Sequence, residues 1–574
     1  MRTYKATALL LAILFFSCGT NRPKNEQQVD QYTVYESRAI EENYQAESDI
    51  STETKLQFVP PVIAEDEKVY AMAEMQDSEI IISAEAAPPA NYRKESPYNR
   101  RRSEEYGQFV ENKFRLAKDQ PLSTFSVDVD AASYSNMRRF INRGELPHND
   151  AIRIEELINY FSYNYPEPSG GDPVRITTEV GNSPWDNQNR LVRIGLKAKS
   201  IASDNLPASN FVFLIDVSGS MEGPTRLELV KSSLKLLVNN LREKDRVAIV
   251  VYAGAAGEVL PSTSGADKQK IKESLDNLSA GGSTAGGAGI KLAYKIAKQN
   301  FIKEGNNRII LCTDGDFNVG ISSNDGLLKL IENERKTGVF LSILGYGMGN
   351  YKDSKMQTLA QAGNGNHAYI DNLQEANKVL VSEFGSTMYA VAKDVKLQIE
   401  FNPSKVQVYR LVGYETRLLN KEDFNNDAID AGEMGAGHTV TAFYEVVPVG
   451  VKSNILGSVD PLKYQKEDAA PDQKAVGHTD LLTVKLRYKQ PDSDTSKKIE
   501  VSLIDNERNE VSDDFRFASA VAMFGQVLKG SQYKGNGSFD KAIALAKSGY
   551  GNDAQGYRRE FVRLMEATKG LSGN

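Results

Sequence analysis

Apolar residues in the middle of the chain alternate between short continuous runs and helical spacing. Residues 211–215 form an unbroken apolar run, as expected for a strand buried in a parallel sheet. Residues 227–241 then carry an apolar residue every three or four positions, which predicts one buried face of a helix. The alternation continues with strands expected at 246–252, 308–312 and 339–344 and helices around 271–278, 290–301 and 327–334. This order predicts a doubly wound α/β domain over residues 208–388.

The segments on both sides of this domain are rich in expected strands and contain helices at their outer ends. Residues 105–200 form an expected N-terminal domain, and residues 389–574 form an expected C-terminal domain. The expected helices are 133–142, 152–161 and two near the C-terminus that carry Phe517 and Phe561; the expected strands are 174–180, 191–198, 395–401, 406–414, 439–447, 481–488 and 499–504. The two ends of a domain often lie close together. We therefore expect these β-rich segments to pair, with the α/β domain inserted between them.

The first residues of the chain have the pattern of a secretory signal. Arg2 and Lys5 precede an apolar run at 6–16, which is too short to span a bilayer and is followed by Ser17 and Cys18. A cysteine at the cleavage position resembles a lipoprotein signal over residues 1–18, and this resemblance implies that lipidated Cys18 anchors the protein to a bacterial membrane in the cell envelope. An ordinary signal with an incidental cysteine is the alternative. Residues 19–104 are polar and predict a disordered tether.

Composition excludes several classes of function. The net charge is −7, with 69 basic and 76 acidic residues, and nothing in this balance indicates a nucleic-acid binder, which normally has a basic domain or stripe. The chain has two cysteines and four histidines. Beyond the signal only Cys312 remains, so no disulfide framework is expected, and no His-Glu-x-x-His motif occurs that would indicate a zinc protease of that type.

Three short segments carry oxygen-bearing side chains at positions where they can meet. Asp216-Val-Ser218-Gly-Ser220 follows the first strand, Gly-Gly-Ser-Thr284 precedes a helix, and Thr-Asp314-Gly follows the strand ending at Cys312. Such positions lie along the edge of a doubly wound sheet that binds ligands. Carboxylates and hydroxyls suit a hard cation with octahedral oxygen coordination, and thiolate or imidazole ligands are missing from these three segments.

These residues, in this order, resemble the metal-ion-dependent adhesion site (MIDAS) of the von Willebrand factor type A (VWA) family. The resemblance implies Mg²⁺ or Mn²⁺, with Ser218, Ser220 and Thr284 as direct or near-direct ligands and Asp216 and Asp314 acting largely through water and hydrogen bonds. It also implies an open metal position that an acidic side chain of a partner protein fills. The flanking segments 121–130, 138–140, 155–161 and 430–441 resemble the bacterial YfbK-like group of VWA lipoproteins.

Four lesser signals have structural interpretations. Asp128 and Asp130 are expected in a turn or cap, and His367 in a turn. The loop at 423–430 is rich in oxygen ligands for calcium, but an EF-hand there would need a glutamate where Met434 stands. Cys312 is expected as a small core residue.

The favoured function is a non-enzymatic, membrane-anchored, metal-dependent protein-binding module. A metal-dependent hydrolase is the rival, but the three motif segments contain no His, Lys or Glu to act as a general base. A scaffold or chaperone that works with a separately encoded ATPase in the envelope is the third hypothesis.

Overall fold

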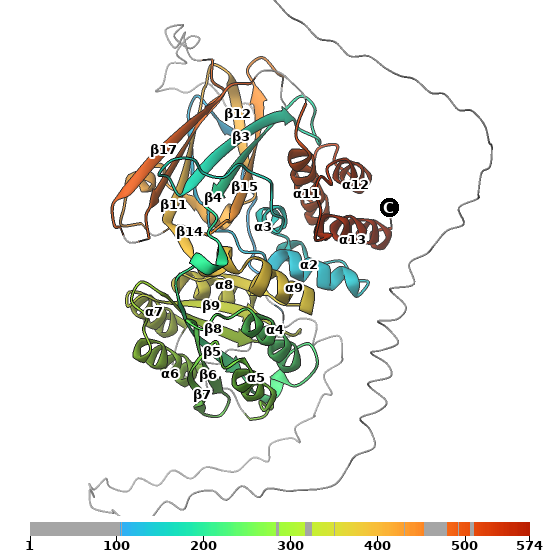
Figure 1. Ribbon diagram of the computed structural model, residues 1–574. Coiled ribbons are helices and arrows are strands. Elements are labelled where there is room, and N and C mark those ends of the chain that lie inside the picture. The colour runs from blue at the N-terminus through green and yellow to red at the C-terminus, as the bar shows by residue number, and fades with distance from the viewer. Residues whose placement is uncertain are drawn as a thin grey trace, which may run out of the picture. The chain divides into compact units, whose positions relative to one another are not determined.

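The structure is a computed structural model, and it describes residue 104 and residues 106–282, 286–315, 324–348, 351–429, 431–452, 479–491, 493–505 and 510–573. All of them belong to one compact unit, Tyr92–Asn574. Its described part contains three sheets and two groups of helices (Figure 1).

A six-stranded sheet forms the centre of the inserted domain. Its strands, in spatial order, are β10 (His367–Tyr369), β9 (Val339–Gly345), β8 (Asn306–Thr313), β5 (Ser209–Asp216), β6 (Arg246–Tyr252) and β7 (Ala256–Ser264). Neighbouring strands are parallel except for β7, which is antiparallel to β6. The predicted doubly wound α/β fold is therefore confirmed, with an antiparallel strand at one edge.

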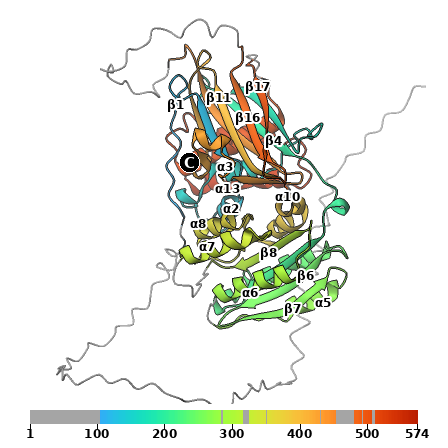
Figure 2. The ribbon, with the colours of Figure 1, turned by 90° about the vertical axis from the view of Figure 1, so that its left-hand side faces the viewer.

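Helices cover both faces of the central sheet: Figure 1 shows helices on either side of its strands, and in Figure 2 the helices of one face lie in front of them. One face packs against α4 (Leu227–Asn239), α5 (Lys268–Asp276), α9 (Leu373–Asn377) and α10 (Phe384–Met388). The other face packs against α6 (Gly286–Gln299), α7 (Asn324–Arg335) and α8 (Asp353–Ala362). Because both faces are covered, the apolar runs of β5 and β8 are buried along their whole length.

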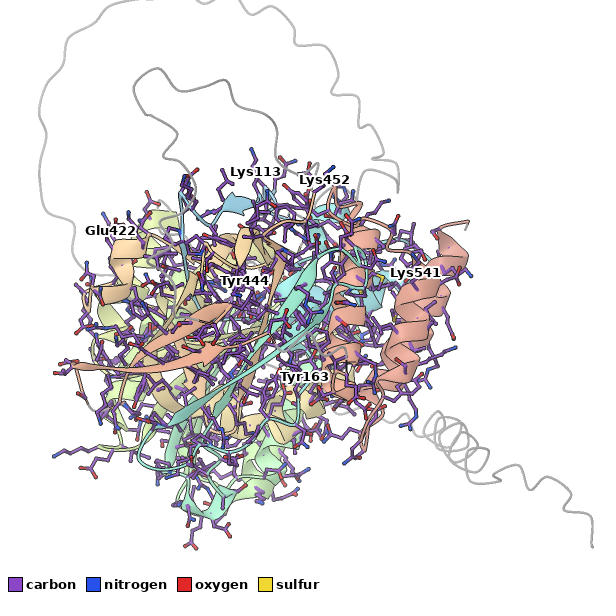
Figure 3. All side chains as sticks on the ribbon, turned by 90° about the horizontal axis from the view of Figure 1, so that it is seen from above. Lys113, Tyr163, Glu422, Tyr444, Lys452 and Lys541 are labelled. Carbon is purple, nitrogen blue, oxygen red and sulfur yellow. The ribbon has the colours of Figure 1, made fainter. Side chains whose placement is uncertain are left out.

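Two more sheets share one apolar core and form a β-sandwich. The first contains β1 (Arg115–Leu116), β12 (Val406–Val412), β15 (Thr439–Pro448), β4 (Arg190–Ala198) and β3 (Val174–Asn182) in that order. The second contains β13 (Leu418–Leu419), β2 (Leu122–Ser126), β11 (Ala390–Phe401), β16 (Leu482–Lys489) and β17 (Ser496–Leu503), with β14 (Gly432–Gly435) paired to β11. In the view of Figure 3, Tyr444 of the sandwich core lies among other side chains, and Glu422 and Lys541 lie toward the margin.

Each sandwich sheet combines strands from before and after the central domain. β2 pairs antiparallel with β11, and Phe125 lies opposite Leu397. β4 pairs antiparallel with β15, and Arg193 lies opposite Phe443. The expected pairing of the flanking segments around an inserted α/β domain is thus confirmed.

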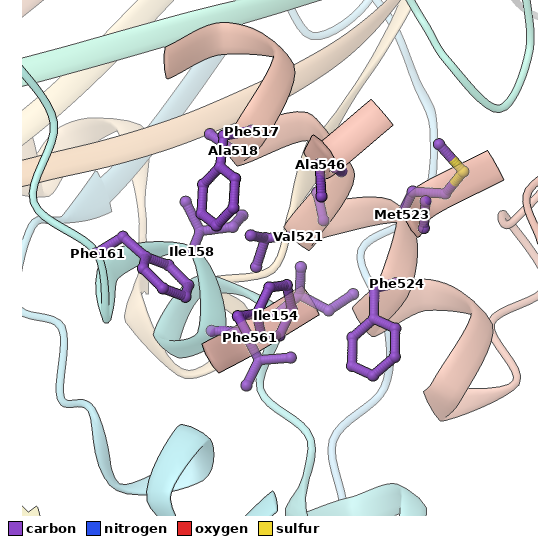
Figure 4. Close-up of a cluster of buried hydrophobic side chains, with 14 of the residues drawn as sticks. Ile154, Ile158, Phe161, Phe517, Ala518, Val521, Met523, Phe524, Ala546 and Phe561 are labelled. Atoms are coloured by element: carbon purple, nitrogen blue, oxygen red, sulfur yellow. The ribbon is translucent and has the colours of Figure 1, made fainter. Parts of the chain in front are cut away.

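Five helices from both flanking segments pack together beside the first sandwich sheet. They are α2 (Ala132–Asn142), α3 (Ile154–Asn159), α11 (Asp513–Lys529), α12 (Phe539–Ser548) and α13 (Tyr557–Leu571), of which α3 and α11 contact the sheet. Their core gathers aromatic and aliphatic side chains, including Phe161, Phe524 and Phe561 (Figure 4). Phe443 of β15 joins this core, with its ring 5.6 Å from that of Phe515. Within the described part of the chain, no helix is both long and apolar enough to cross a membrane.

Some elements escaped the sequence analysis. The edge strand β7 was not predicted because its residues are mostly half-buried or exposed and form no apolar run. β10 has only three residues, which is too short for a periodic signal. Phe301 was placed on the apolar face of a helix, but α6 ends at Gln299 and the Phe301 side chain is 44% exposed.

Candidate metal centre

The candidate site lies where the strand order of the central sheet reverses. β5 and β8 are parallel neighbours, but the chain leaves β5 toward β6 on one side and leaves β8 toward β9 on the other. Asp216 is the last residue of β5, and Asp314 follows the last residue of β8. The chain therefore turns to opposite sides after the two strands, and the carboxyl edge at such a point is the usual ligand position in sheets of this kind.

Three donors fix the carboxylate of Asp216. Its Oδ2 accepts hydrogen bonds from the hydroxyls of Tyr252, at 3.0 Å, and Thr313, at 3.1 Å, and its Oδ1 accepts one from the backbone N–H of Ser218, at 3.0 Å. Burial raises the pKa of Asp216, and the neighbouring carboxylate of Asp314 adds to this effect. A cation bound at this edge would oppose both effects by favouring the charged carboxylate.

The two serines of the first motif segment face each other. Their Oγ atoms are 3.1 Å apart, and the Ser218 side chain is buried. Two backbone hydrogen bonds bring the glycine segment beside them: Gly281 N–H donates to the carbonyl of Val217 at 2.8 Å, and Gly219 N–H donates to the carbonyl of Gly282 at 3.1 Å. Gly282 has φ +87°, a conformation that a β-carbon would strain.

The structure thus brings together Asp216, Ser218, Ser220 and the glycines that precede Thr284. Thr284 itself lies outside the described residues, as does Cys18. The roles of all these residues as metal ligands, and of Cys18 in lipidation, remain predictions.

A positive side chain that the sequence analysis missed lies beside the third motif segment. Asp314 is buried, and its Oδ2 is 3.9 Å from Nε of Arg226 in the loop before α4. Arg226 also donates from Nη2 to the carbonyl of Met348 at 2.8 Å. The guanidinium therefore partly neutralises Asp314 and joins the loops that follow β5 and β9. Its position in the sequence, beyond the serine motif, carried no signal of this contact.

The donor set fits a hard divalent cation. Two adjacent neutral hydroxyls and a carboxylate held rigidly behind them are the ligand types that Mg²⁺ and Mn²⁺ prefer. Among the described residues, no cluster of three or more His, Cys, Asp or Glu side chains is placed to hold a metal.

The structure corrects or explains three of the lesser signals. His367 was expected in a turn, but it begins β10, is buried, and its Nε2 lies 2.6 Å from the hydroxyl of Tyr351. In the loop at 423–429, Asp427 binds Arg487 at 3.1 Å and accepts from Ser496, so this carboxylate is already neutralised by protein groups. Cys312 is a buried, free thiol in the core, as expected, and burial raises its pKa.

Asp130 also has a structural role. Its carboxylate accepts hydrogen bonds from the Gln357 side chain at 2.9 Å, the His367 N–H at 3.1 Å and Arg417 at 3.0 Å. These bonds join the segment after β2 to α8, β10 and the loop before β13. Asp130 therefore holds the inserted domain against the flanking segments.

Comparison with known families agrees with this architecture. The family model "von Willebrand factor type A domain" matches residues 210–382, and "Uncharacterized protein YfbK, C-terminal" matches residues 386–571. A third model, described as "von Willebrand factor", matches residues 100–193.

Similar proteins come from several sources. Protein YfbK of Escherichia coli K12 is 46% identical over 477 residues, which cover 81% of each chain. A solved von Willebrand factor type A protein from Catenulispora acidiphila is 15% identical and has a TM-score of 0.36. The match covers 78% of this chain and 89% of that chain. Another similar structure is proximal thread matrix protein 1 from the mussel byssus, solved with a zinc-occupied MIDAS motif. It is 23% identical and has a TM-score of 0.26, and the match covers 31% of this chain and 45% of that chain. By its likeness to the E. coli protein over most of both chains, the chain belongs to the YfbK-like family, whose members combine a von Willebrand factor type A domain with the YfbK C-terminal domain.

Proposed function

We propose that this protein is a non-enzymatic, metal-dependent protein-binding module. The observation that carries the proposal is the pair of Ser218 and Ser220 hydroxyls, 3.1 Å apart, in front of the carboxylate of Asp216, which three donors hold in place. Mg²⁺ or Mn²⁺ would be held by Ser218, Ser220 and Thr284, with Asp216 and Asp314 acting through water and hydrogen bonds. The bound ion would supply a positive charge that attracts an anionic ligand.

The shortage of negative charge around the ion favours binding of an acidic partner. Only two carboxylates are proposed at the site, and one of them, Asp314, already lies 3.9 Å from the guanidinium of Arg226. A divalent ion there retains net positive charge and an affinity for one more oxygen anion. An Asp or Glu side chain of a partner protein would supply that anion.

The same geometry disfavours hydrolysis. A general base must be free to accept a proton from an attacking water. Both oxygens of Asp216 already accept hydrogen bonds, and the buried carboxylate of Asp314 lies 3.9 Å from the Arg226 guanidinium. We therefore keep the hydrolase as the alternative that the binding experiment must exclude.

The proposed location is the cell envelope, with lipid on Cys18 and residues 19–104 as a tether that separates the binding domain from the membrane. The support is the sequence pattern at residues 2–18. Mass spectrometry of the membrane fraction tests this part: a Cys18→Ala variant should lose the lipidated N-terminal peptide and leave the membrane fraction.

Calorimetric titration of the full chain with Mg²⁺ and with Mn²⁺ tests the metal site. We expect wild type to bind and Ser220→Ala and Thr284→Ala to bind at least about tenfold more weakly, because each variant loses one ligand oxygen. Asp276→Ala, which removes a carboxylate 55% exposed on α5, is the matched control and should bind like wild type. Equal binding by wild type and Ser220→Ala would refute the assigned ligands.

A second measurement links the metal to a partner. Proteins captured from an envelope extract by wild type in Mg²⁺ should be released by a chelator and should not be captured by Ser220→Ala. If capture is the same with and without metal, the partner binds elsewhere and the metal-dependent mode is wrong. Hydrolysis of the captured protein in the presence of metal would favour the hydrolase instead.

A further inference from the structure

A polar cavity of about 270 Å³ lies at the opposite, amino edge of the central sheet. Arg308, near the start of β8, and the segment before β10 line it on the side of the inserted domain. Residues of β13 and β14 line it on the side of the sandwich, and Ser386 and Thr387 of α10 complete the wall. The cavity is therefore formed only because the α/β domain is inserted into the sandwich.

Arg308 differs from the other buried arginines in the described part of the chain. It is 2% exposed and forms no ion pair with the residues described, although the carboxylate of Glu433, in the same cavity wall, acts on its charge from beyond ion-pair distance. Each of the other arginines less than a tenth exposed is paired with a carboxylate; these are Arg138, Arg139, Arg153, Arg193, Arg410, Arg417 and Arg558. The positive charge of Arg308 is thus the one in this set that lacks a protein counter-charge in contact.

The few contacts of Arg308 leave part of its guanidinium without a partner. Nη1 donates to the hydroxyl of Ser342 at 2.7 Å, and the guanidinium carbon lies 5.6 Å from the ring centre of Phe340. Nε is buried and has no hydrogen-bond partner among the described residues. Burial lowers the pKa of Arg308 to about 10, which still leaves it charged at neutral pH. A buried charge without a partner is costly, so an arginine kept in this position indicates a bound anion.

The lining of the cavity indicates the kind of anion. Arg417, the second arginine in the wall, is already paired with Asp128 at 2.9 Å and Asp130 at 3.0 Å. Glu433, also in the wall, acts on the charge of Arg308 without an ion-pair contact, so Arg308 is the arginine of the wall whose guanidinium has no carboxylate of the described residues in contact. Asn364 and Asn366 add neutral groups that can hydrogen-bond a small oxygen anion. A planar guanidinium matches the two oxygens of a carboxylate.

We propose that this cavity binds a single carboxylate group, with Arg308 as its anchor. The group belongs either to a small free acid or to the C-terminus of a peptide, since both present the same anion. The site is separate from the metal centre, which lies at the carboxyl edge of the same sheet.

Thermal unfolding of the full chain with defined probes tests the proposal. The probes are propionate, trialanine with a free C-terminus, trialanine amide and chloride at equal ionic strength. A ligand that binds only the folded protein raises the unfolding temperature with concentration. We expect at least one carboxylate probe to do so while the amide and chloride do not. Propionate without trialanine would identify a free acid, and trialanine without propionate would identify a peptide C-terminus.

Arg308→Met provides the decisive variant. We expect its affinity for the active probe to fall at least about 30-fold, the lower end of the effect of losing a buried charge pair. Without ligand it should unfold at the same or a higher temperature than wild type, because an unpaired buried charge is removed, so lost binding is not due to misfolding. Arg246→Met on β6, whose guanidinium donates to Ser262, is the matched control and should keep the response.

Three results would overturn the proposal. They are the absence of stabilisation of wild type by either carboxylate probe, an equal effect of chloride, and an Arg308→Met variant that responds like wild type.

Discussion

Replacing Arg138 should weaken the connection between the inserted domain and the flanking helices. Arg138 lies on α2 and is fully buried. Its Nε and Nη2 donate to the two carboxylate oxygens of Asp371, at 2.8 and 2.5 Å, and Nη2 also donates to Glu375 at 2.7 Å. Both acids belong to the inserted domain, after β10 and on α9. One guanidinium therefore neutralises two carboxylates across the boundary.

Arg138→Met keeps most of the side-chain volume but leaves both acids without their partner. Asp371 is 6% exposed and Glu375 is 1% exposed, so water cannot replace the lost hydrogen bonds without rearrangement. Burial already raises the pKa of Asp371. Removing one member of such a buried network typically costs about 3–5 kcal/mol. We expect the free energy of unfolding to fall by that amount at pH 7.

Urea unfolding followed by tryptophan fluorescence measures this change. The chain has a single tryptophan, Trp185, which is 1% exposed and belongs to the helical core that contains α2. Lys569→Met is the control, because its ion pair with Asp540 is 2.6 Å long but exposed, and such pairs contribute only about 0–1 kcal/mol. If Arg138→Met unfolds within 1 kcal/mol of the control, the network does not hold the two parts together.

A second background separates charge from packing. In a chain that already carries Asp371→Asn and Glu375→Gln, Arg138→Met removes the counter-charge of only one remaining paired carboxylate in the described part of the chain, the 17% exposed Glu560 at 3.5 Å. We therefore expect the loss from Arg138→Met to be smaller in this background by at least about 1 kcal/mol. An equal loss in both backgrounds would assign the effect to packing rather than to the ion pairs.

Three further changes should have defined effects. Burial lowers the pKa of His367 below its ordinary value of 6.5. The neutral ring therefore stabilises the fold above pH 6.5, and this contribution is lost as the pH falls. In urea titrations at pH 5 to 7, His367→Gln should reduce the dependence of the unfolding free energy on pH by up to about 1.4 kcal/mol per pH unit. Gly435→Ala should lower stability by about 1–3 kcal/mol in the same assay, because its Cβ would lie 1.9 Å from the carbonyl oxygen of Ser386; no change would mean that this backbone contact relaxes freely. Ser512→Ala should cost about 1 kcal/mol, because the Ser512 hydroxyl accepts from Phe515 N–H at 3.1 Å and caps α11, and wild-type stability would contradict that role.

The central domain was predictable because its strands are buried on both faces. β5 and β8 form continuous apolar runs, and the helices between them have one apolar side. β7 was not predictable from the same signal, because an edge strand with exposed residues has no apolar run. In the sandwich, the strands themselves were evident, but their order was not, since periodicity does not state which strand lies beside which.

The candidate metal site was predictable to the extent that its residues follow strand ends. Asp216 ends β5 and Asp314 directly follows β8, its neighbour in the sheet, as the alternating order of strands and helices predicts. The donors that fix Asp216 were harder to predict from the sequence, because Tyr252 has the pattern of the last apolar residue of β6 rather than of a hydrogen-bond donor. Arg226 gave no signal at all, since its contact with Asp314 depends on how the loop before α4 folds back.

The arginine in the cavity was hidden for a different reason, which lies in the insertion itself. Ser209 and Tyr389, where the chain enters and leaves the inserted domain, are joined by their hydroxyls at 2.5 Å. The amino edge of the central sheet therefore faces the sandwich, and Arg308, near the start of β8, becomes buried beside residues of β13 and β14. In a free-standing α/β domain, a charged residue at the start of a strand would be near water. Its burial without a carboxylate partner is a property of the whole chain, so it is visible only in the assembled fold.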